Sequence, residues 1–166
     1  MYSVSQGCPC GYLTDPGRRC RCPSTKVTAY LAKVSGPLLD RIDIHLDVPA
    51  VPFETLTRPL PSESSESIRT RILQAQRRQR ERLSSLGISG NAHLRHKDLA
   101  TTCPLHPDAA ALLKSAMREL GLSARAYDKV LKIGRTIADL AASDTILPEH
   151  VAEAIQYRSL DRQLWL

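Results

Sequence analysis

The sequence predicts a mainly α-helical chain, with a C-terminal helical bundle preceded by a cysteine-rich loop and a single β-strand. Apolar residues recur at helical spacing from Ser64 onwards, whereas only residues 42–48 alternate with the period of two of a strand. Four of the five cysteines lie within residues 8–22. One Trp and one Phe leave a core of Leu, Ile, Val and Ala, which suits helices packed on helices.

Composition limits the class of protein. With 166 residues and 42% hydrophobic content, the chain can hold one domain, or a small domain and part of another. Its formal charge of +6 suits a nucleic-acid partner only where the charges cluster. No apolar run reaches the ~18 residues of a membrane span, and the N-terminus lacks a signal-peptide pattern. We therefore expect a cytoplasmic protein with no membrane partner and with reduced cysteines.

The cysteine cluster reads "CPCGYLTDPGRRCRC", two CxC pairs separated by nine residues. Four thiolates form a closed structural zinc site, although CxC is tighter than the usual ligand spacing. Neighbouring arginines would offset the negative charge of such a centre. The alternative is a set of free thiols, or a disulfide formed on oxidation. The candidate zinc ligands are Cys8, Cys10, Cys20 and Cys22.

The stretch "SGPLLDRIDIHLDV" begins as a turn and continues as the predicted strand. Its isoleucines, Leu46 and Val48 fall on one face, opposite Asp43, His45 and Asp47, which predicts a half-buried strand. Arg41 precedes it, between Asp40 and Asp43, and pairing with either aspartate is the simplest interpretation. Residues 49–63 contain four prolines, so we expect a linker at 51–63 between a region 1–50 and a region 64–166.

A long basic helix is predicted from Ser64 or Ser65, as its cap, to Gly87 and Gly90. One stripe is apolar and the other surface carries arginines. These could contact a DNA backbone, or they could form a solvated face. The helix has no aromatic residue for stacking on bases. The candidate nucleic-acid contacts are Arg69, Arg71, Arg77, Arg78, Arg80 and Arg82.

Three further helices complete the predicted bundle. We expect one at about residues 107–120, a second over 123–142 with Ser123 as its cap, and a third from Pro148. The second has a wide apolar stripe, which predicts burial. A polar loop is expected between the basic helix and this group.

Three motifs in the same order resemble one family: the cysteine cluster, "SGPLLDRIDIHLDV" and the segment beginning "LSARAYDKVLKIGRTIADL". They are similar to the C-terminal third of the magnesium-chelatase-like AAA+ ATPases of the competence protein ComM type, over about residues 8–162. The resemblance implies that residues 1–50 are the end of the α/β core with a remnant strand, and that 64–166 are the helical lid.

The family resemblance also implies roles for single arginines. Arg41 matches the arginine finger, which reaches toward the γ-phosphate of ATP in a neighbouring subunit. Arg125 matches the sensor-2 arginine that contacts bound nucleotide, and Arg135 is a second candidate for that contact. The alternative for both is a surface arginine. Position 134 is Gly where the family usually has Ala.

The sequence departs from the family in three places. It contains no GxxxxGK[ST] loop and no apolar strand ending in paired acids, and Gln6-Gly7 stands where the sensor-1 asparagine is expected. We therefore expect no ATP hydrolysis from this chain alone, with ATP and Mg²⁺ bound only in the full-length protein.

The implied parent is a homohexameric DNA motor for branch migration in natural transformation. Two alternatives remain: an ATP-driven subunit that inserts magnesium into a tetrapyrrole, and a non-enzymatic zinc-and-helix module that binds DNA.

Overall fold

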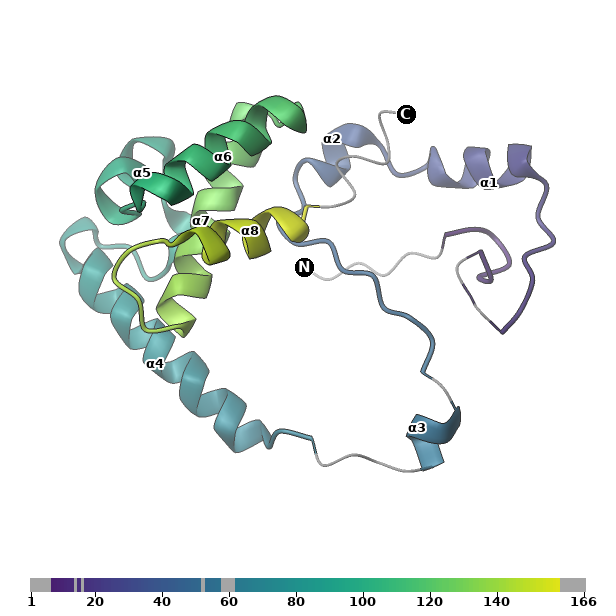
Figure 1. Ribbon diagram of the computed structural model, residues 1–166, viewed down its shortest axis with the longest axis horizontal. Helices are drawn as coiled ribbons and strands as arrows, with labels where there is room; N and C mark the ends of the chain where they lie inside the picture. Colours follow the sequence, from purple (N-terminus) through teal and green to yellow (C-terminus); the bar gives the residue numbers. More distant parts are fainter. Residues whose placement is uncertain (1–6, 14, 16, 52, 58–61, 159–166) are drawn as a thin grey trace. The chain divides into compact units, whose positions relative to one another are not determined.

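The computed structural model describes residues 7–13, 15, 17–51, 53–57 and 62–158, and these residues are mainly helical (Figure 1). Within those ranges no strand forms, and the only β-type pairing is an isolated parallel bridge between Leu105 and Ile146. The predicted mainly α class is confirmed. None of the described helices is long and apolar enough to cross a membrane.

The chain divides into two compact units. One comprises the residues up to Ile42 together with Leu46–Ser62, and it contains the short helices α1 (Ser24–Leu31), α2 (Gly36–Leu39) and α3 (Phe53–Thr57). Cys8 and Leu39 are the buried hydrophobic residues among its described positions. The other unit comprises Asp43–His45 and everything from Glu63 onwards.

The predicted strand at residues 42–48 is wrong. Its expected inner face is exposed, with Leu46 at 68% and Val48 at 84%, whereas His45 on the expected outer face is buried at 6%. A strand needs a neighbour for its backbone N–H and C=O groups. The described chain offers no such neighbour, and the N–H of His45 donates instead to the carbonyl oxygen of Tyr157 (2.7 Å).

The long basic helix is α4 (Ser65–Leu83), and it begins as predicted. The N–H of Ser67 donates to Oγ of Ser64 (3.2 Å), which confirms Ser64 as the cap. A 3₁₀ turn, η1 (Ser84–Leu86), follows α4 and ends at Gly87, whose φ of 63° is left-handed and therefore favours glycine.

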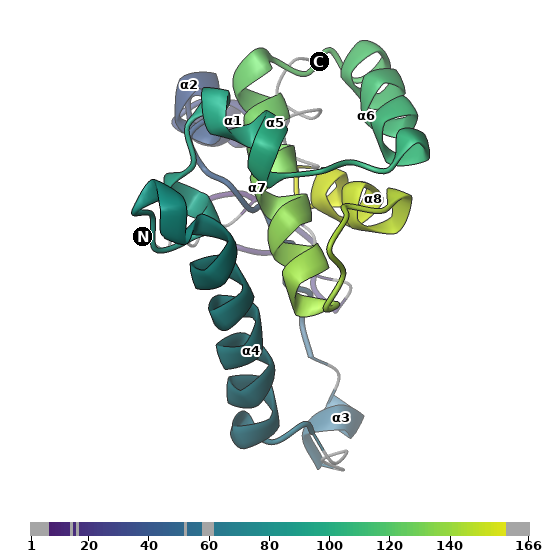
Figure 2. The ribbon, with the colours of Figure 1, turned by 90° about the vertical axis from the view of Figure 1, so that its left-hand side faces the viewer.

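Only part of the apolar stripe of α4 is buried. Ala75 and Leu83 are 4% and 0% exposed, whereas Ile68 and Ile72 are 40% and 44% exposed. The first turns of α4 extend away from the helices of its own unit, as Figure 2 shows. The second half of the helix therefore carries its packing.

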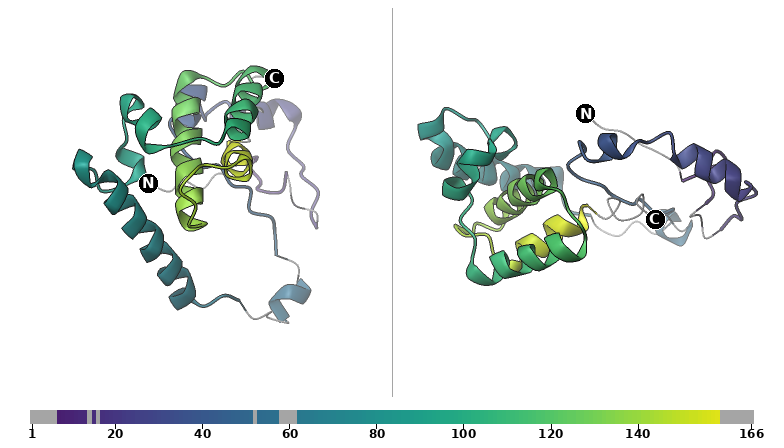
Figure 3. Two further views of the ribbon diagram at one scale, coloured as in Figure 1. Left: turned by 60° about the vertical axis from the view of Figure 1, so that its left-hand side comes forward. Right: turned by 90° about the horizontal axis from the view of Figure 1, so that it is seen from above.

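Helix α7 (Ala124–Leu140) is the centre of the bundle, packing against α4, α5 (His96–Thr102) and α8 (Pro148–Gln156). Helix α6 (Pro107–Glu119) lies alongside α8, green beside yellow in the right view of Figure 3. The N–H of Ala126 donates to Oγ of Ser123 (3.1 Å), so Ser123 caps α7 as predicted. The fully buried side chains of this core include Leu83, Leu99, Leu113, Val130, Ile146 and Val151.

Helix α5 and the short 3₁₀ turn η2 (Asn91–His93) replace the predicted polar loop. Asp98 stabilises the start of α5, since its Oδ2 accepts from the backbone N–H of Arg95 (3.2 Å) and from Arg95 Nε (3.0 Å). This contact with Arg95 lowers the pKa of Asp98. A seven-residue helix is too short to show a clear helical period, and so the sequence pattern missed it.

Candidate metal centre and arginine sites

The four predicted cysteine ligands come together in one cluster. All four Sγ atoms of Cys8, Cys10, Cys20 and Cys22 lie within 4.8 Å of one another. The Sγ atom of Cys8 is 3.3 Å from that of Cys10 and 3.6 Å from that of Cys20. A tetrahedral zinc centre with Zn–S bonds of about 2.3 Å separates its sulfurs by about 3.8 Å. The cluster therefore has the size and the donor set to hold a metal ion.

Local backbone geometry builds this cluster. Gly11 has a left-handed φ of 81°, and its N–H donates to the carbonyl oxygen of Cys8 (3.0 Å), which closes the turn around Cys10. In the second pair, the N–H of Cys22 donates to Sγ of Cys20 (3.4 Å). Such N–H···S contacts stabilise negative charge on a sulfur.

A tyrosine and an arginine brace the loop between the two cysteine pairs. Arg18 donates to the hydroxyl of Tyr12 (2.9 Å), and its guanidinium carbon lies 5.2 Å from the centre of the Tyr12 ring. The contact combines a hydrogen bond with a cation–π interaction. It links the two halves of the loop that carries the candidate ligands.

The thiols do not share one pKa. The backbone N–H of Tyr12, and then the thiol of Cys8, lower the pKa of Cys10 to about 6. The N–H of Cys22 lowers the pKa of Cys20, but burial and the neighbouring thiols outweigh it and raise that pKa to about 12. The contact with Cys10, followed by burial, raises the pKa of Cys22. One negative charge is thus accepted readily, and further thiolates need a cation to compensate them.

Arg41 follows Asp40, the residue that caps the C-terminus of α2, and is exposed. Asp43, one of its two expected partners, pairs instead with Lys129, whose Nζ lies 2.9 Å from Oδ1 of Asp43. Arg125 lies in the first turn of α7 and is also exposed. Both positions are accessible to a ligand.

Arg135 is placed differently, with no exposed surface. Its Nε donates to Oδ1 of Asp139 (3.2 Å), and its terminal nitrogens donate to the carbonyl oxygens of Asp144 (2.7 Å) and Ser143. Burial lowers the pKa of Arg135. These contacts enclose the guanidinium of Arg135 within the bundle, and the nucleotide contact expected for it stays a prediction.

The six arginines of α4 do not form one free basic face. Arg82 forms an ion pair with the buried Asp139 (2.6 Å). Arg71 pairs with Glu63 (2.7 Å) and Arg78 with Asp144 (3.1 Å). The exposed arginines of α4 are Arg69, Arg71, Arg77 and Arg80.

Sequence reasoning missed Asp139 and Asn91, the buried partners of Arg82. A charged residue in the apolar stripe of α7 was the one available signal for Asp139.

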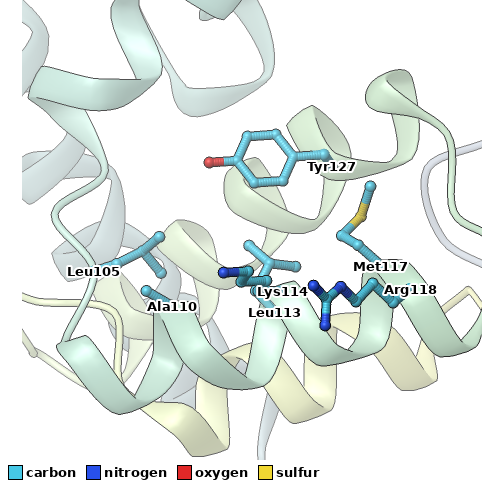
Figure 4. Close-up of a pocket in the computed structure, with 7 residues that line it drawn as sticks. All are labelled: Leu105, Ala110, Leu113, Lys114, Met117, Arg118 and Tyr127. Carbon is cyan, nitrogen blue, oxygen red and sulfur yellow. The ribbon is translucent and has the colours of Figure 1, made fainter.

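A cavity of about 370 Å³ lies between α6 and α7 (Figure 4). Its apolar lining includes Leu105, Leu113 and Met117, and the ring of Tyr127 faces α6 across it. The side chains of Lys114 and Arg118 on α6 add two positive charges to the lining. None of the residues predicted from the sequence to form a site lines this cavity.

Comparison with known proteins finds the same family along the chain. The family described as "Magnesium chelatase, subunit ChlI C-terminal" matches residues 62–158, and "Magnesium chelatase, subunit ChlI" matches residues 3–56. The chain is 37% identical over 157 residues to competence protein ComM of Haemophilus influenzae, which covers 94% of the chain and 30% of ComM.

Other relatives give the same picture. The chain is 38% identical over 149 residues to the uncharacterized protein YifB of Escherichia coli, covering 89% of the chain and 29% of YifB. It is 30% identical over 153 residues to the uncharacterized protein Rv2897c of Mycobacterium tuberculosis, covering 91% of the chain and 29% of that relative. The chain thus spans less than a third of the length of these relatives.

Proposed function

The chain belongs to the magnesium chelatase subunit ChlI family and is of the ComM type, and from this premise we propose that it is the C-terminal part of a ring-forming AAA+ ATPase that acts on DNA. The observation that carries the proposal is the family match, which includes Arg41 within residues 3–56 and continues over residues 62–158. The exposure of Arg41 after α2 is compatible with a contact outside its own chain.

In this proposal Arg41 acts as an arginine finger. Its guanidinium meets the γ-phosphoryl group of ATP held by the neighbouring subunit and stabilises the charge that develops as that group is transferred. A residue that acts in a neighbour requires assembly, and a closed ring gives every subunit the same neighbour. We propose a homohexamer. ATP and Mg²⁺ are bound by the ATPase core, and Arg125 at the start of α7 contacts the nucleotide from the lid.

The test uses a chimera, because this chain spans less than a third of the length of its relatives. The chain replaces the matching segment of Haemophilus influenzae ComM. Arg41→Ala is then mixed with a variant that lacks the phosphate-binding lysine of the ATPase core. We expect each variant alone to be inactive and the mixed rings to recover ATP hydrolysis. Normal hydrolysis by Arg41→Ala alone would overturn the proposal. Arg118→Ala, on the exposed face of α6, is the matched control.

We further propose that the cysteine cluster holds zinc in a structural role. Four protein sulfurs complete a tetrahedral coordination shell, so no position is left for a water or a substrate. The bound ion would fix the loop of residues 8–22 in a region with little hydrophobic core.

The DNA contact is proposed for the exposed side of α4. The family includes a competence protein by name, and the arginines of α4 give a basic strip that can lie along phosphates. Branch migration of DNA is the task that the ComM-type resemblance implies.

Magnesium insertion into a tetrapyrrole is the second candidate, since both matched families are described as magnesium chelatase. The two proposals separate in one assay. DNA should stimulate ATP hydrolysis by the chimera if the motor acts on DNA, whereas a chelatase subunit should not respond to DNA.

A further inference from the structure

We infer that Lys129 is a positioning residue for Arg41: through Asp43 it attaches the segment that follows the arginine finger to the lid helix α7. The inference rests on the proposed function and deepens it. It concerns how the finger is held and how its position is linked to the nucleotide of the same subunit.

The ion pair between α7 and the finger segment is the first observation. Lys129 Nζ lies 2.9 Å from Asp43 Oδ1, and the two side chains are 12% and 67% exposed. Lys129 thus has most of its stem buried against the bundle and presents its ammonium to the carboxylate of Asp43. Separation from Asp43 would leave this largely buried ammonium without the carboxylate that compensates it, which favours the paired position of Asp43.

A backbone hydrogen bond provides the second attachment. The N–H of His45 donates to the carbonyl oxygen of Tyr157 (2.7 Å), just past the end of α8, and His45 is buried at 6%. Residues 43–45 consequently belong to the same compact unit as the bundle, whereas the residues on either side of them do not. Residues 43–45 therefore contact the bundle at two points. Asp43 binds Lys129 of α7, and His45 binds Tyr157 at the end of α8.

Chain connectivity transmits this attachment to the finger. Arg41 precedes Asp43 by two residues, so their Cα atoms are at most about 7 Å apart. Fixing Asp43 on α7 therefore restricts where the backbone of Arg41 can go. A finger that must meet one phosphoryl group gains from such restriction, because misplacement by about 1 Å can cost a hundredfold in rate.

The position of Lys129 on α7 adds a link to the nucleotide. Arg125, the proposed nucleotide contact, precedes Lys129 by four residues, so the two lie one above the other on the same face of the helix. A shift of α7 when Arg125 gains or loses its nucleotide would move Asp43 as well. Binding or release of nucleotide at one ATP site would then change the position of Arg41, which acts at the ATP site of the neighbouring subunit.

The experiment compares single and double variants in the ComM chimera. Lys129→Ala is expected to lower kcat about tenfold with little change in the KM for ATP. The charge exchange Lys129→Asp with Asp43→Lys should recover much of the loss, because it restores the pair with reversed charges. Lys132→Ala is the matched control, since Lys132 lies one turn along α7 and donates to the carbonyl oxygen of Ala92 (3.4 Å). Wild-type kcat in Lys129→Ala, or no recovery in the double variant, would overturn the inference.

A second readout separates the inference from the proposed function. In the 166-residue chain itself, Lys129→Ala should speed hydrogen exchange at the N–H of His45 while leaving the urea midpoint of the bundle within the range of Lys132→Ala. If Arg41→Ala is active in the chimera, the proposed function fails whatever Lys129 does. If Arg41→Ala is inactive and Lys129→Ala is normal, only the inference fails.

Discussion

Arg82 of α4 and Asp139 of α7 form a bidentate ion pair, with nitrogen-to-oxygen distances of 2.6 and 2.7 Å. The side chain of Asp139 is fully buried, and its carboxylate also accepts from Arg135 and from Nδ2 of Asn91 (2.9 Å). One carboxylate therefore compensates two guanidinium groups. This ion pair links the basic helix to the centre of the bundle, in addition to the apolar packing of Leu83 in the core.

Removing that carboxylate should destabilise the bundle strongly. Asp139→Ala leaves Arg135 buried without a counter-charge, and breaking a buried pair in this way costs about 3–5 kcal/mol. Urea unfolding followed by circular dichroism measures the change in the free energy of unfolding. Arg80→Ala, at an exposed position on α4, should change it by less than about 0.5 kcal/mol. A loss in Asp139→Ala no larger than in Arg80→Ala would contradict the interpretation.

Gly134→Ala should stabilise the protein. A Cβ at this position would lie 3.5 Å from Cγ2 of Ile146 and 3.6 Å from the carbonyl oxygen of His150, which are ordinary contacts. Alanine in the middle of α7 then gains about 0.5–1 kcal/mol of helix propensity. The measurement is the urea midpoint.

Gly121→Ala is the opposing control for this substitution. Gly121 has a left-handed φ of 59°, and the same change there should cost about 1 kcal/mol. Equal effects at the two glycines would show that backbone conformation and helix propensity do not set the outcome.

Sequence patterns predicted the features that depend on local chemistry. The Ser64 and Ser123 caps, the start of α8 at Pro148 and the gathering of two CxC pairs follow from nearby residues, and the structure has all of them. The strand at residues 42–48 failed because a strand depends on a partner, and an alternating pattern does not say whether one is present. The ion pair between Arg82 and Asp139 was missed because the two residues are 57 positions apart along the chain and only the fold brings them together. The ligand contacts expected for Arg82 and Arg135 stay predictions.

Zinc binding should depend on pH in a direction set by the thiol pKa values. Near pH 7, Cys10, with a pKa of about 6, is mostly thiolate, whereas Cys20, with a pKa of about 12, and Cys22, with a raised pKa, keep their protons. Zinc must displace at least those two protons. The affinity should therefore fall at least about a hundredfold for each unit of decrease in pH. Competition with a chromophoric chelator at pH 6, 7 and 8 measures it.

Substitution of single cysteines provides the control for the zinc prediction. Cys8→Ser removes one of the clustered sulfurs and should abolish tight binding of a single equivalent. Cys103→Ala should leave binding unchanged, because Cys103 is buried in the helical core, where burial raises its pKa. Unchanged zinc content in Cys8→Ser, or an affinity independent of pH, would contradict the four-sulfur site.

DNA binding should depend on the exposed arginines of α4 and not on Arg82. Each phosphate contact adds about 0.9 to the magnitude of the slope of log affinity against log salt concentration. The double variant Arg69→Ala, Arg77→Ala should therefore lower the magnitude of that slope by about 2. It should also weaken binding to all DNA sequences alike. Fluorescence anisotropy with duplex DNA at several salt concentrations measures both quantities.

Arg95→Ala, which removes an exposed arginine at the start of α5, is the matched control. Because the guanidinium of Arg82 is already held by Asp139, loss of Arg82 should act through stability alone. An unchanged salt slope in the Arg69 and Arg77 double variant would place the DNA contact elsewhere on the protein.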